Sequence, residues 1–542
     1  MEAVKAFSCL FLLACAALAD DSARIAALLK QGSVVTIPPG DYHLEGAEPL
    51  RLRSNLTVMA HGARFILPKT LPDQARVVVF AGEDVSHLSW HGGEFIGHVF
   101  DPSKRDNTWE PNANTKGIEI TTTREGGTHD LLFRDIKADG MAGAVIGVHG
   151  LYGARSESEV QAYAERVALE GCTLLRSGKF MWDYGYLWQI LTFPEAYEAW
   201  EIERARKYFR TDLMREVRMT AGDDRVRLDN TQRPLLISQT EEPKEALTFM
   251  GSELPKNLVR GRQYFVVSAA PDFIKIAERP QGEPIRFETA GSGHLAFNLS
   301  GTYLGAYAPT GSGPGKGAFD IVGARDVRVT GCQLSALGDT MHIQRCRNII
   351  FASNHILGSR MGAFFLAEFC QNATITGNLV DGTNGSRVVS VEKSCTDVTM
   401  TGNTFRNGGR GAWINQPVNL VMTGNLFINN TTKNEPDMRR GRIAYQTGRP
   451  GSFPEMYFTL YEPGASYGPV IVRDNIFQLG DAAPEDAVTF APNGHDLIFE
   501  GNIFTGRKAN VVMDPSCVRS RVQGNPGADT VSRAVDFNHG RR

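Results

Sequence analysis

The amino-acid sequence predicts an all-β protein that is built as a parallel β-helix. Three observations lead to this prediction: a short apolar phrase that returns about every 22 to 30 residues, a column of asparagines, and a column of cysteines. Alternating β-branched residues, a Gly/Asn corner and a second apolar run at that period are what one coil of such a solenoid needs. One coil cannot bury its apolar face alone. Stacked coils can, because each strand pairs with its equivalent about 4.8 Å above and below.

The repeated phrase is clearest in the C-terminal half of the chain. Its copies are Val327–Leu334, Ile349–Ile356, Ala373–Leu379, Val398–Phe405, Leu420–Phe427, Ile471–Phe477 and Ile498–Phe504. Asparagine tolerates left-handed backbone geometry, and its amide can hydrogen-bond to the next asparagine in a stack. We therefore expect an internal ladder of the corner residues Asn354, Asn378, Asn403, Asn425, Asn475 and Asn502.

The cysteines follow the same phase. Cys346, Cys370 and Cys395 each precede the corner asparagine of their own coil by eight residues, whereas Cys172 and Cys332 replace a corner asparagine. Because these positions face the interior, we expect free, buried thiols that act as small apolar residues, and not a disulfide framework. The same expectation covers Cys517.

The N-terminus has the features of a secretory leader. Met1 to Ala19 contains one lysine, an apolar run and an Ala-Leu-Ala end, which predicts cleavage after Ala19 and a secreted or periplasmic protein. Leu12 to Cys15 also resembles a lipoprotein box, so anchoring at Cys15 is the alternative. No later apolar run approaches the roughly 20 residues that span a bilayer. The net charge of −3 without a basic stripe argues against a nucleic-acid partner.

The mature chain is expected to have four parts. Residues 20–176 hold a capping helix, Ser22–Lys30, and the first coils, because an uncapped solenoid would expose unpaired strand edges. Residues 177–219 form an aromatic and helical insertion, with a helix expected from Pro194 to Phe209. Residues 220–294 form an inserted, strand-rich β module, and the coils resume at Leu295 and run through 295–542.

Two segments resemble known families. Val34–Tyr42, with its Pro-Pro-Gly turn, and Leu50–Val58 resemble the opening of the pectate-lyase-like superfamily. This resemblance implies a right-handed, single-stranded parallel β-helix. Leu254–Ala269 resembles a small β module common in phage tail and surface proteins, which implies adhesion or spacing more than catalysis.

Candidate site residues are found by aligning the coils on the corner asparagine. The interior is packed, so a site must lie on an outer face or under long connections. Asp320 and His342 stand twelve residues before the corner. Ten residues before it stand Gln344, Glu368, Lys393 and Asn415, and slightly earlier in the coils come Asp339, Arg360 and Arg387. We therefore expect Asp320 beside His342, and Glu368 beside Lys393, on one face.

These residue types suit two reactions on polysaccharides. Inverting glycoside hydrolysis needs two carboxyls about 6.5 to 9.5 Å apart, and Asp320 and Glu368 are two coils apart, about 9.6 Å. Asp339 and Glu368 are one coil apart plus an offset, and Lys393 beside Glu368 would favour its use as the base. A lyase instead needs cations and a base, which Lys393, Arg360, Arg387 and His342 provide.

The coils around Asp339 also resemble polygalacturonase-like glycoside hydrolases. Gly338-Asp339-Thr340 stands where that family has Gly-Asp-Asp, and Arg387 stands where it has the Arg of Arg-Ile-Lys. The resemblance implies a catalytic Asp339 and a substrate-binding Arg387. Thr340 replaces the second Asp, and Arg360-Met361-Gly362 stands where the family has Gly-His-Gly.

The sequence thus predicts a secreted carbohydrate-active enzyme, a glycoside hydrolase with its groove over coils 320–415. The alternatives are a polysaccharide lyase or C5-epimerase acting on a uronan, and a non-catalytic carbohydrate-binding or adhesion protein. Aromatic side chains of the insertion either stack on sugar or pack onto the coil beneath. No cofactor is predicted, Ca²⁺ stays open because carboxylates are scattered, and a monomer is expected. The candidate catalytic residues are Asp339, Glu368, His342, Lys393 and Asp320, and the candidate substrate-binding residues are Arg360, Arg387, Gln344, Asn415, Trp413, Trp182, Tyr184, Tyr186 and Trp188.

Overall fold

The computed structural model describes most of the chain from residue 20 to residue 535. The described ranges are 20–46, 48–69, 71, 75–98, 114–152, 159–178, 214–228, 235–239, 246–259, 262–299, 316–336, 338–359, 362–382, 387–431, 453–460 and 464–535. The expected leader, the helix expected from Pro194 to Phe209, Arg360, and the aromatic residues Trp182, Tyr184, Tyr186 and Trp188 lie outside the described residues.

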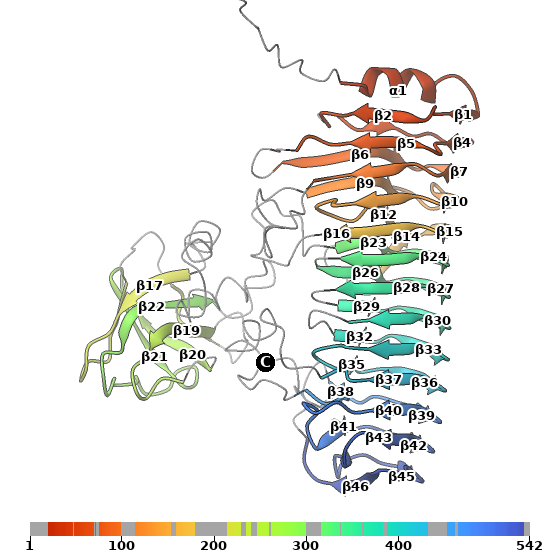
Figure 1. Ribbon diagram of the computed structural model, residues 1–542. Coiled ribbons are helices and arrows are strands. Elements are labelled where there is room, and N and C mark those ends of the chain that lie inside the picture. Colours follow the sequence, from red (N-terminus) through yellow and green to blue (C-terminus); the bar gives the residue numbers. More distant parts are fainter. Residues whose placement is uncertain are drawn as a thin grey trace, which may run out of the picture.

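Three long parallel sheets run the length of a rod (Figure 1). Sheet A contains β1 (Val34–Thr36), β4 (Leu56–Met59), β7 (Ser86–His91), β10 (His129–Arg134), β15 (Ala164–Glu170), β24 (Ala324–Thr330), β27 (Arg347–Ala352), β30 (Gln371–Thr376), β33 (Thr396–Thr401), β36 (Val418–Thr423), β39 (Val470–Arg473), β42 (Leu497–Glu500) and β45 (Arg521–Gln523). Sheet B contains β2 (Gly40–His43), β5 (Ala63–Ile66), β8 (Glu94–Ile96), β11 (Lys137–Asp139), β16 (Thr173–Ser177), β25 (Gln333–Ala336), β28 (His355–Ser359), β31 (Leu379–Asp381), β34 (Thr404–Arg406), β37 (Leu426–Ile428), β40 (Ile476–Gln478) and β43 (Ile503–Thr505).

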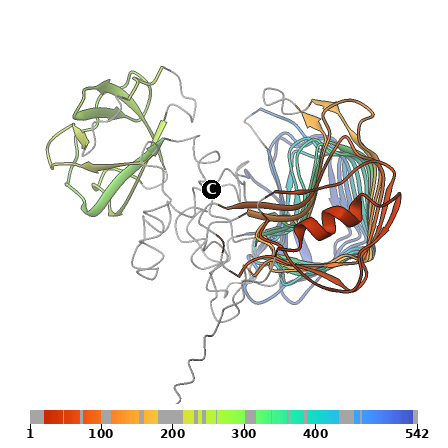
Figure 2. The ribbon, with the colours of Figure 1, turned by 90° about the horizontal axis from the view of Figure 1, so that it is seen from above.

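Sheet C forms the remaining face of the rod. It contains β3 (Leu50–Arg51), β6 (Arg76–Glu83), β9 (Asn114–Thr121), β12 (Ile146–His149), β23 (Lys316–Val322), β26 (Asp339–Gln344), β29 (Gly362–Leu366), β32 (Arg387–Val391), β35 (Ala412–Asn415), β38 (Met456–Thr459), β41 (Asp486–Phe490), β44 (Ala509–Met513) and β46 (Ala528–Ser532). Each coil except the last therefore contributes one strand to each sheet, and the predicted right-handed parallel β-helix is confirmed. The helix α1 (Ser22–Leu29) lies across the open end of the rod in Figure 2 and buries Ile25 and Leu29 against the first coil.

The repeated phrase sets the register between coils. Val327 of β24 pairs with Ile349 of β27, which pairs with Ala373 of β30. The same backbone position continues through Val398 and Leu420. Because strands alternate their side chains, all of these residues point inward and are at most 1% exposed.

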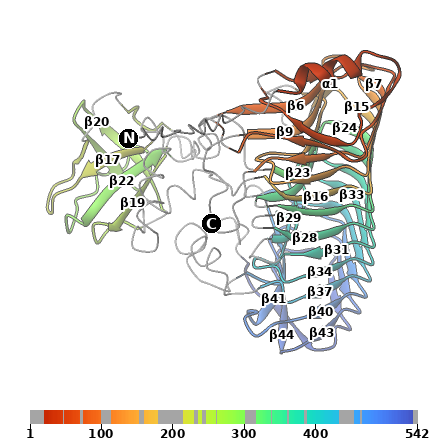
Figure 3. The same cartoon turned by 45° about the horizontal axis from the view of Figure 1, so that its top comes forward.

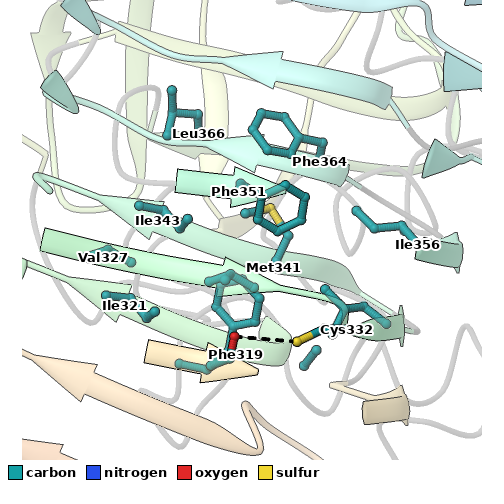
Figure 4. Packing of buried hydrophobic residues seen from close by; sticks show 14 of the residues in the cluster. Phe319, Ile321, Val327, Cys332, Met341, Ile343, Phe351, Ile356, Phe364 and Leu366 are labelled. Atoms are coloured by element: carbon teal, nitrogen blue, oxygen red, sulfur yellow. Dashed lines mark hydrogen bonds between the residues drawn. The ribbon is translucent and has the colours of Figure 1, made fainter. Parts of the chain in front are cut away.

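Side chains from all three sheets fill the interior. Figure 4 shows Phe319, Met341 and Phe364 of successive sheet C strands meeting Val327 and Phe351 of sheet A. Further along the rod, Phe405, Phe427, Phe477 and Phe504 stack on one another, with ring centroids 5.1, 4.9 and 4.8 Å apart. These separations match the spacing between coils of about 4.8 Å, so one stack of rings follows the rod axis.

The predicted asparagine ladder is confirmed and runs on to Asn525. The Nδ2 of Asn378 donates to the Oδ1 of Asn403 at 2.9 Å and to the carbonyl oxygen of Phe351 at 2.9 Å. The Oδ1 of Asn403 also accepts the backbone N–H of Asn378 at 3.0 Å. Each side chain thus satisfies buried backbone groups at the corner between sheets A and B.

The predicted free cysteines are also confirmed. Every cysteine in the described ranges is a free thiol, and only Cys517 is not fully buried. Cys332 stands in the ladder position, because its backbone N–H donates to the Oδ1 of Asn354 at 2.9 Å.

A separate barrel interrupts the rod between β16 and β23 (Figure 3). It has its own apolar core, which includes Phe249, Tyr264 and Phe297. Our expectation that the coils resume at Leu295 was wrong, because β22 pairs with β17 and β19 inside the barrel. Alternating apolar residues suit a barrel strand as well as a coil, so the pattern alone did not separate them. The barrel strands are β17 (Met214–Arg218), β18 (Val226–Leu228), β19 (Ala246–Glu253), β20 (Gln263–Ala269), β21 (Phe273–Ala277) and β22 (Ser292–Leu299).

The ladder makes a testable contribution to stability. Asn403→Ala removes one of the two bonds of the Asn378 amide and leaves the backbone N–H of Asn378 and the carbonyl oxygen of Ile375 without their partner. Each buried unsatisfied group costs about 1 to 3 kcal/mol, so we expect the free energy of unfolding to fall by about 3 kcal/mol or more in urea denaturation. Gln478→Ala, which removes an exposed amide from β40, should change it by less than about 0.5 kcal/mol. Equal effects of the two substitutions would contradict this account.

One buried carboxyl accompanies the ladder lower in the rod. Glu455 is fully buried directly before β38. Its carboxyl accepts the backbone N–H of Asn430 at 3.1 and 3.0 Å, and the Nδ2 of Asn430 at 2.6 Å. Burial raises the pKa of Glu455 to about 7, although the hydrogen bonds from Asn430 oppose the rise.

This raised pKa predicts a pH-dependent stability. The unfolded carboxyl loses its proton near pH 4.5, whereas the folded one keeps it to about pH 7. Stability should therefore be greatest below pH 4.5 and fall as the pH rises to 7, by up to about 3 kcal/mol from this group. We expect Glu455→Gln to reduce that fall in urea titrations at several pH values. An unchanged difference in stability between pH 4.5 and 7 would count against a protonated Glu455.

Candidate functional site

The outer face of sheet C carries a row of polar and aromatic side chains. Asp320 pairs with His342 in register, and Ile343 pairs with Leu366, which sets His342 opposite Phe365. Phe365 in turn pairs with Ser390, and Ser390 with Trp413. Equivalent positions on neighbouring coils lie about 4.8 Å apart, so this central row gathers residues that are far apart in the chain.

Asp320 lies between two histidines. The Nδ1 of His342 is 2.7 Å from its Oδ1, and the Nε2 of His149, on β12, is 3.4 Å from its Oδ2. The predicted neighbourhood of Asp320 and His342 is confirmed. Burial acts to raise the pKa of Asp320, but the neighbouring His342 and His149 hold it well below its usual value.

His342 is arranged as an oriented imidazole. Burial lowers its pKa, the charge of Lys316 lowers it further, and Asp320 offsets only part of the fall. We assign the Nδ1 proton to the hydrogen bond with Asp320, because a carboxylate only accepts. The Nε2 then carries the free lone pair, which is the arrangement of a general base.

Phe365 is the centre of the site. The Lys316 ammonium lies 5.1 Å from the centroid of its ring, and the His342 ring lies 5.5 Å from it. The same Lys316 Nζ is 3.4 Å from the Oδ2 of Asp339, which is 6% exposed at the start of β26. Around one half-buried aromatic ring there are thus a cation, an imidazole and a carboxylate.

Two more carboxyls, Glu368 and Glu392, lie just after the C-terminal ends of β29 and β32. Burial raises the pKa of Glu392 to about 7, and the neighbouring charge of Glu368 adds to the rise, while Lys316 and Arg387 oppose it. Glu368 itself accepts a hydrogen bond from the Nε2 of Gln344 at 3.2 Å. The site therefore contains one carboxyl with a pKa raised to about 7 and another, Asp320, with a pKa well below its usual value.

Aligning the coils on the corner asparagine selected residues that lie one position too late in the coils of β29 and β32. Because Leu366 pairs with Val391 and Val391 with Ile414, the position equivalent to Asn415 is Glu392 and not Lys393. The path from an inward residue of sheet C to the next inward residue of sheet A is one residue longer after β29 and β32, as from Leu366 to Ala373, than after β26, from Ile343 to Ile349. Counting back from the corner asparagine therefore selected Glu368 and Lys393, which lie in the turns. The Lys393 ammonium lies 5.9 Å from the ring centroid of Phe369.

Trp413 and Asn415, two of the candidate substrate-binding residues, are buried. Trp413 is 6% exposed and forms a buried cluster with Phe453 and Tyr457. Its Nε1 donates to the Oγ1 of Thr459 at 2.7 Å, and Asn415 donates to the same oxygen at 2.7 Å. The guanidinium of Arg387 lies 4.3 Å from the Trp413 ring centroid. Trp413 and Asn415 thus bond to Thr459 within the rod and support the site from β35, the strand that follows β32 in sheet C.

The sequence did not single out Lys316, Phe365, Glu392, His149 or Tyr152. The sequence could have indicated Lys316 and Phe365, because they lie opposite Asp339 and His342 on neighbouring coils. Tyr152 lies on a hairpin of β13 (Leu151–Tyr152) and β14 (Val160–Ala162), which interrupts the coil and hides its phase. Burial and the charge of Asp320 raise the pKa of Tyr152, whose ring lies 4.9 Å from the guanidinium carbon of Arg345.

Possible metal ligands lie elsewhere. Within the described ranges, one group of three metal-ligating side chains lies in mutual reach, formed by His87, His129 and Asp130 on sheet A. None of the helices in these ranges has the length and apolar character needed to cross a membrane.

Comparisons with known proteins agree on the solenoid. A family model described as "Right handed beta helix region" matches residues 310–448. No curated protein sequence matches the chain. The A-module of the mannuronan C-5 epimerase AlgE6 of Azotobacter vinelandii has 11% identity over 96% of both chains, with a TM-score of 0.43.

Two other solved structures are an adhesin and a hydrolase. The surface adhesin PfbA of Streptococcus pneumoniae has 11% identity over 96% of this chain and 90% of its own, with a TM-score of 0.41. The endo-xylogalacturonan hydrolase of Aspergillus tubingensis has 10% identity over 95% of this chain and 90% of its own, with a TM-score of 0.29. At these identities and TM-scores the solved structures assign no chemistry to this chain.

The electrostatics of His342 can be measured directly. Because the Lys316 charge lowers the pKa of His342 and Asp320 raises it, Lys316→Met should raise that pKa and Asp320→Asn should lower it. NMR titration of the imidazole signals, with His342 assigned through His342→Gln, gives each value. Lys508→Met, which removes an exposed partner of Asp529, serves as the control and should leave it unchanged. A wild-type pKa above 6.5 would contradict the arrangement.

Proposed function

We propose that this protein is a carbohydrate-active enzyme that hydrolyses glycosidic bonds of a polysaccharide on the outer face of sheet C. The observation that carries the proposal is one carboxyl, Glu392, whose pKa burial raises to about 7, on the surface that also holds Asp339, Lys316 and Phe365. Environments that push the pKa values of neighbouring carboxyls apart are how glycosidases divide the roles of acid and base.

Glu392 is the proposed general acid. It keeps its proton up to about pH 7 and therefore has one to give to the leaving glycosidic oxygen. Asp339, in an ion pair with Lys316, is the proposed base that activates water. The two residues belong to coils two levels apart, and the charge of Asp339 contributes to the raised pKa of Glu392.

The side chains between the two carboxyls suit a sugar ring. Phe365 offers an aromatic ring against which an apolar sugar face can stack, and it lies on the strand between β26 and β32. Lys316 and Gln344 supply hydrogen-bond donors on either side of it. Glu368 has a supporting role in this assignment, since its negative charge helps to keep Glu392 protonated.

One observation favours a second candidate, β-elimination or C5 epimerisation of a uronan. The His342 imidazole is oriented by the contact of its Nδ1 with Asp320, and the Lys316 ammonium lies beside the same Phe365 ring. A neutral imidazole is a suitable base for the C5 proton, and a cation can neutralise a uronate carboxylate. The inserted barrel is the feature that favours a non-catalytic adhesion protein. The leader expected at Met1 to Ala19 would deliver any of these proteins to extracellular polysaccharide.

A panel of neutral and uronate-containing polysaccharides separates these functions. Hydrolysis releases reducing ends without absorbance of unsaturated uronate, whereas a lyase produces both signals. Epimerisation changes the uronate composition, measured by NMR, without cleavage. Binding without any of these changes would support adhesion and overturn the proposal.

Substitution of the proposed acid gives the sharper prediction. Glu392→Gln should lower the hydrolysis rate by about 10² to 10⁴-fold, because a general acid contributes that much. Wild-type activity should fall as the pH rises through 7, and Glu368→Gln should move that fall to lower pH because it removes a like charge.

Glu94→Gln provides a matched control. Glu94 is a partly exposed carboxyl on sheet B that lies 3.4 Å from Arg64, so its loss should leave the rate unchanged. An active Glu392→Gln protein with the wild-type pH profile would refute Glu392 as the acid.

A further inference from the structure

Sheet A carries a second cluster of reactive side chains that the proposed site does not use. His87 on β7 and His129 and Asp130 on β10 present three ligand atoms that all lie within 4.8 Å of one another. The Nδ1 of His129 is 2.8 Å from the Oδ2 of Asp130, and the Nδ1 of His87 is 3.4 Å from the same oxygen.

The backbone directs these side chains together. His129 pairs with Ser86 and Leu131 pairs with Leu88, so Asp130 lies opposite His87 on the adjacent coil. Both of these residues have left-handed backbone geometry, with φ of 52° and 56°. This kink turns two neighbouring residues of β10 to the same side, where the rings of His87 and His129 meet at 90° with centroids 4.9 Å apart.

We infer that His87, His129 and Asp130 form a zinc site that links the coils of β7 and β10. Two imidazole nitrogens and one carboxylate oxygen are a donor set that zinc accepts, with a fourth position left for water. Zinc–nitrogen bonds of about 2.0 to 2.1 Å in a tetrahedron put ligand atoms about 3.3 Å apart, and the observed 3.4 and 2.8 Å lie close to that value. Imidazole ligands favour zinc over Ca²⁺ or Mg²⁺, which take oxygen ligands.

The surroundings of Asp130 suit a ligand. The Nε of Arg166 donates to its Oδ1 at 2.6 Å and the Nη2 donates to its Oδ2 at 3.0 Å, which fixes the plane of the carboxylate. A carboxylate oxygen has a second lone pair for the metal, and partners of this kind orient ligands in metal sites.

The ligands are open to solvent. The His87, His129 and Asp130 side chains are 57%, 25% and 35% exposed, so an ion can enter without rearrangement of the rod.

The rod contains an internal control. His495, Asp496 and Arg519 repeat the arrangement, with 2.9 Å between His495 Nδ1 and Asp496 Oδ2, and two hydrogen bonds of 2.7 Å from Arg519. Val470 pairs with Leu497, so the position opposite Asp496 on the preceding coil is Pro469, which supplies no ligand. A surface His–Asp–Arg cluster is therefore common to both places, and the second imidazole is what distinguishes the zinc site.

The test uses the full-length chain without a histidine tag, because a tag would bind the metal. Isothermal titration with ZnCl₂ near pH 7.5 should give one zinc ion per chain in the micromolar range or tighter. His87→Asn and His129→Ala should each weaken that binding by about 100-fold or more. Asn retains the left-handed geometry at residue 87, and circular dichroism verifies that both variants fold.

His495→Ala is the matched control and should bind zinc as the wild type does. Zinc should raise the midpoint of thermal unfolding of the wild-type and His495→Ala proteins, and EDTA should reverse the rise, because binding to the folded state stabilises it. Absence of zinc binding by the wild type would overturn the inference. Equal binding by the folded His87→Asn and His129→Ala proteins, or loss of binding in His495→Ala, would also overturn it.

Discussion

The in-register pairing of each strand with its equivalent in the next coil is the constraint on which the rest of the structure depends. Parallel backbone hydrogen bonds set the distance between coils, and the asparagine ladder prevents the coils from slipping, since each side chain bonds the backbone of its neighbour. A one-residue slip would turn every inward side chain outward. The ring stack from Phe405 to Phe504 depends on the same spacing, and so does the row of polar residues on sheet C.

The candidate site shows how a solenoid creates chemistry on a regular surface. A flat parallel sheet offers no cleft of its own, so the side chains must supply different environments. Burial and the Glu368 charge keep Glu392 protonated, whereas two histidines keep Asp320 ionised only a few coils away. The lysine and phenylalanine between these groups come from strands that are 49 residues apart in the chain, Lys316 and Phe365, yet a ring and an ammonium lie within 5.1 Å. Proximity on this face is therefore a property of the stack and not of any one coil.

Much of the fold was predictable because the apolar phrase and the asparagine at the corner of each coil repeat along the chain. The ladder residues, the free thiols and the neighbourhood of Asp320 and His342 all follow from one phase counted along the chain. The prediction of the site was less complete. Turns of unequal length after β29 and β32 shifted the count by one, which exchanged Glu392 for Lys393. His149 lies directly before the hairpin that holds Tyr152, and this hairpin interrupts the periodic pattern, so their place beside Asp320 had no counterpart in the linear pattern.

The sequence by itself determined the class of fold, the spacing of the coils and the residues that face inward, because strand alternation and the corner asparagines are local properties that repeat. The tertiary structure alone decided which carboxyl is protonated, that Trp413 is buried, and that Leu295 belongs to a barrel. These outcomes depend on burial, on charge and on hydrogen-bond partners from distant segments. A pattern of single residues contains no measure of those surroundings, since desolvation and pairing arise only when the coils are stacked.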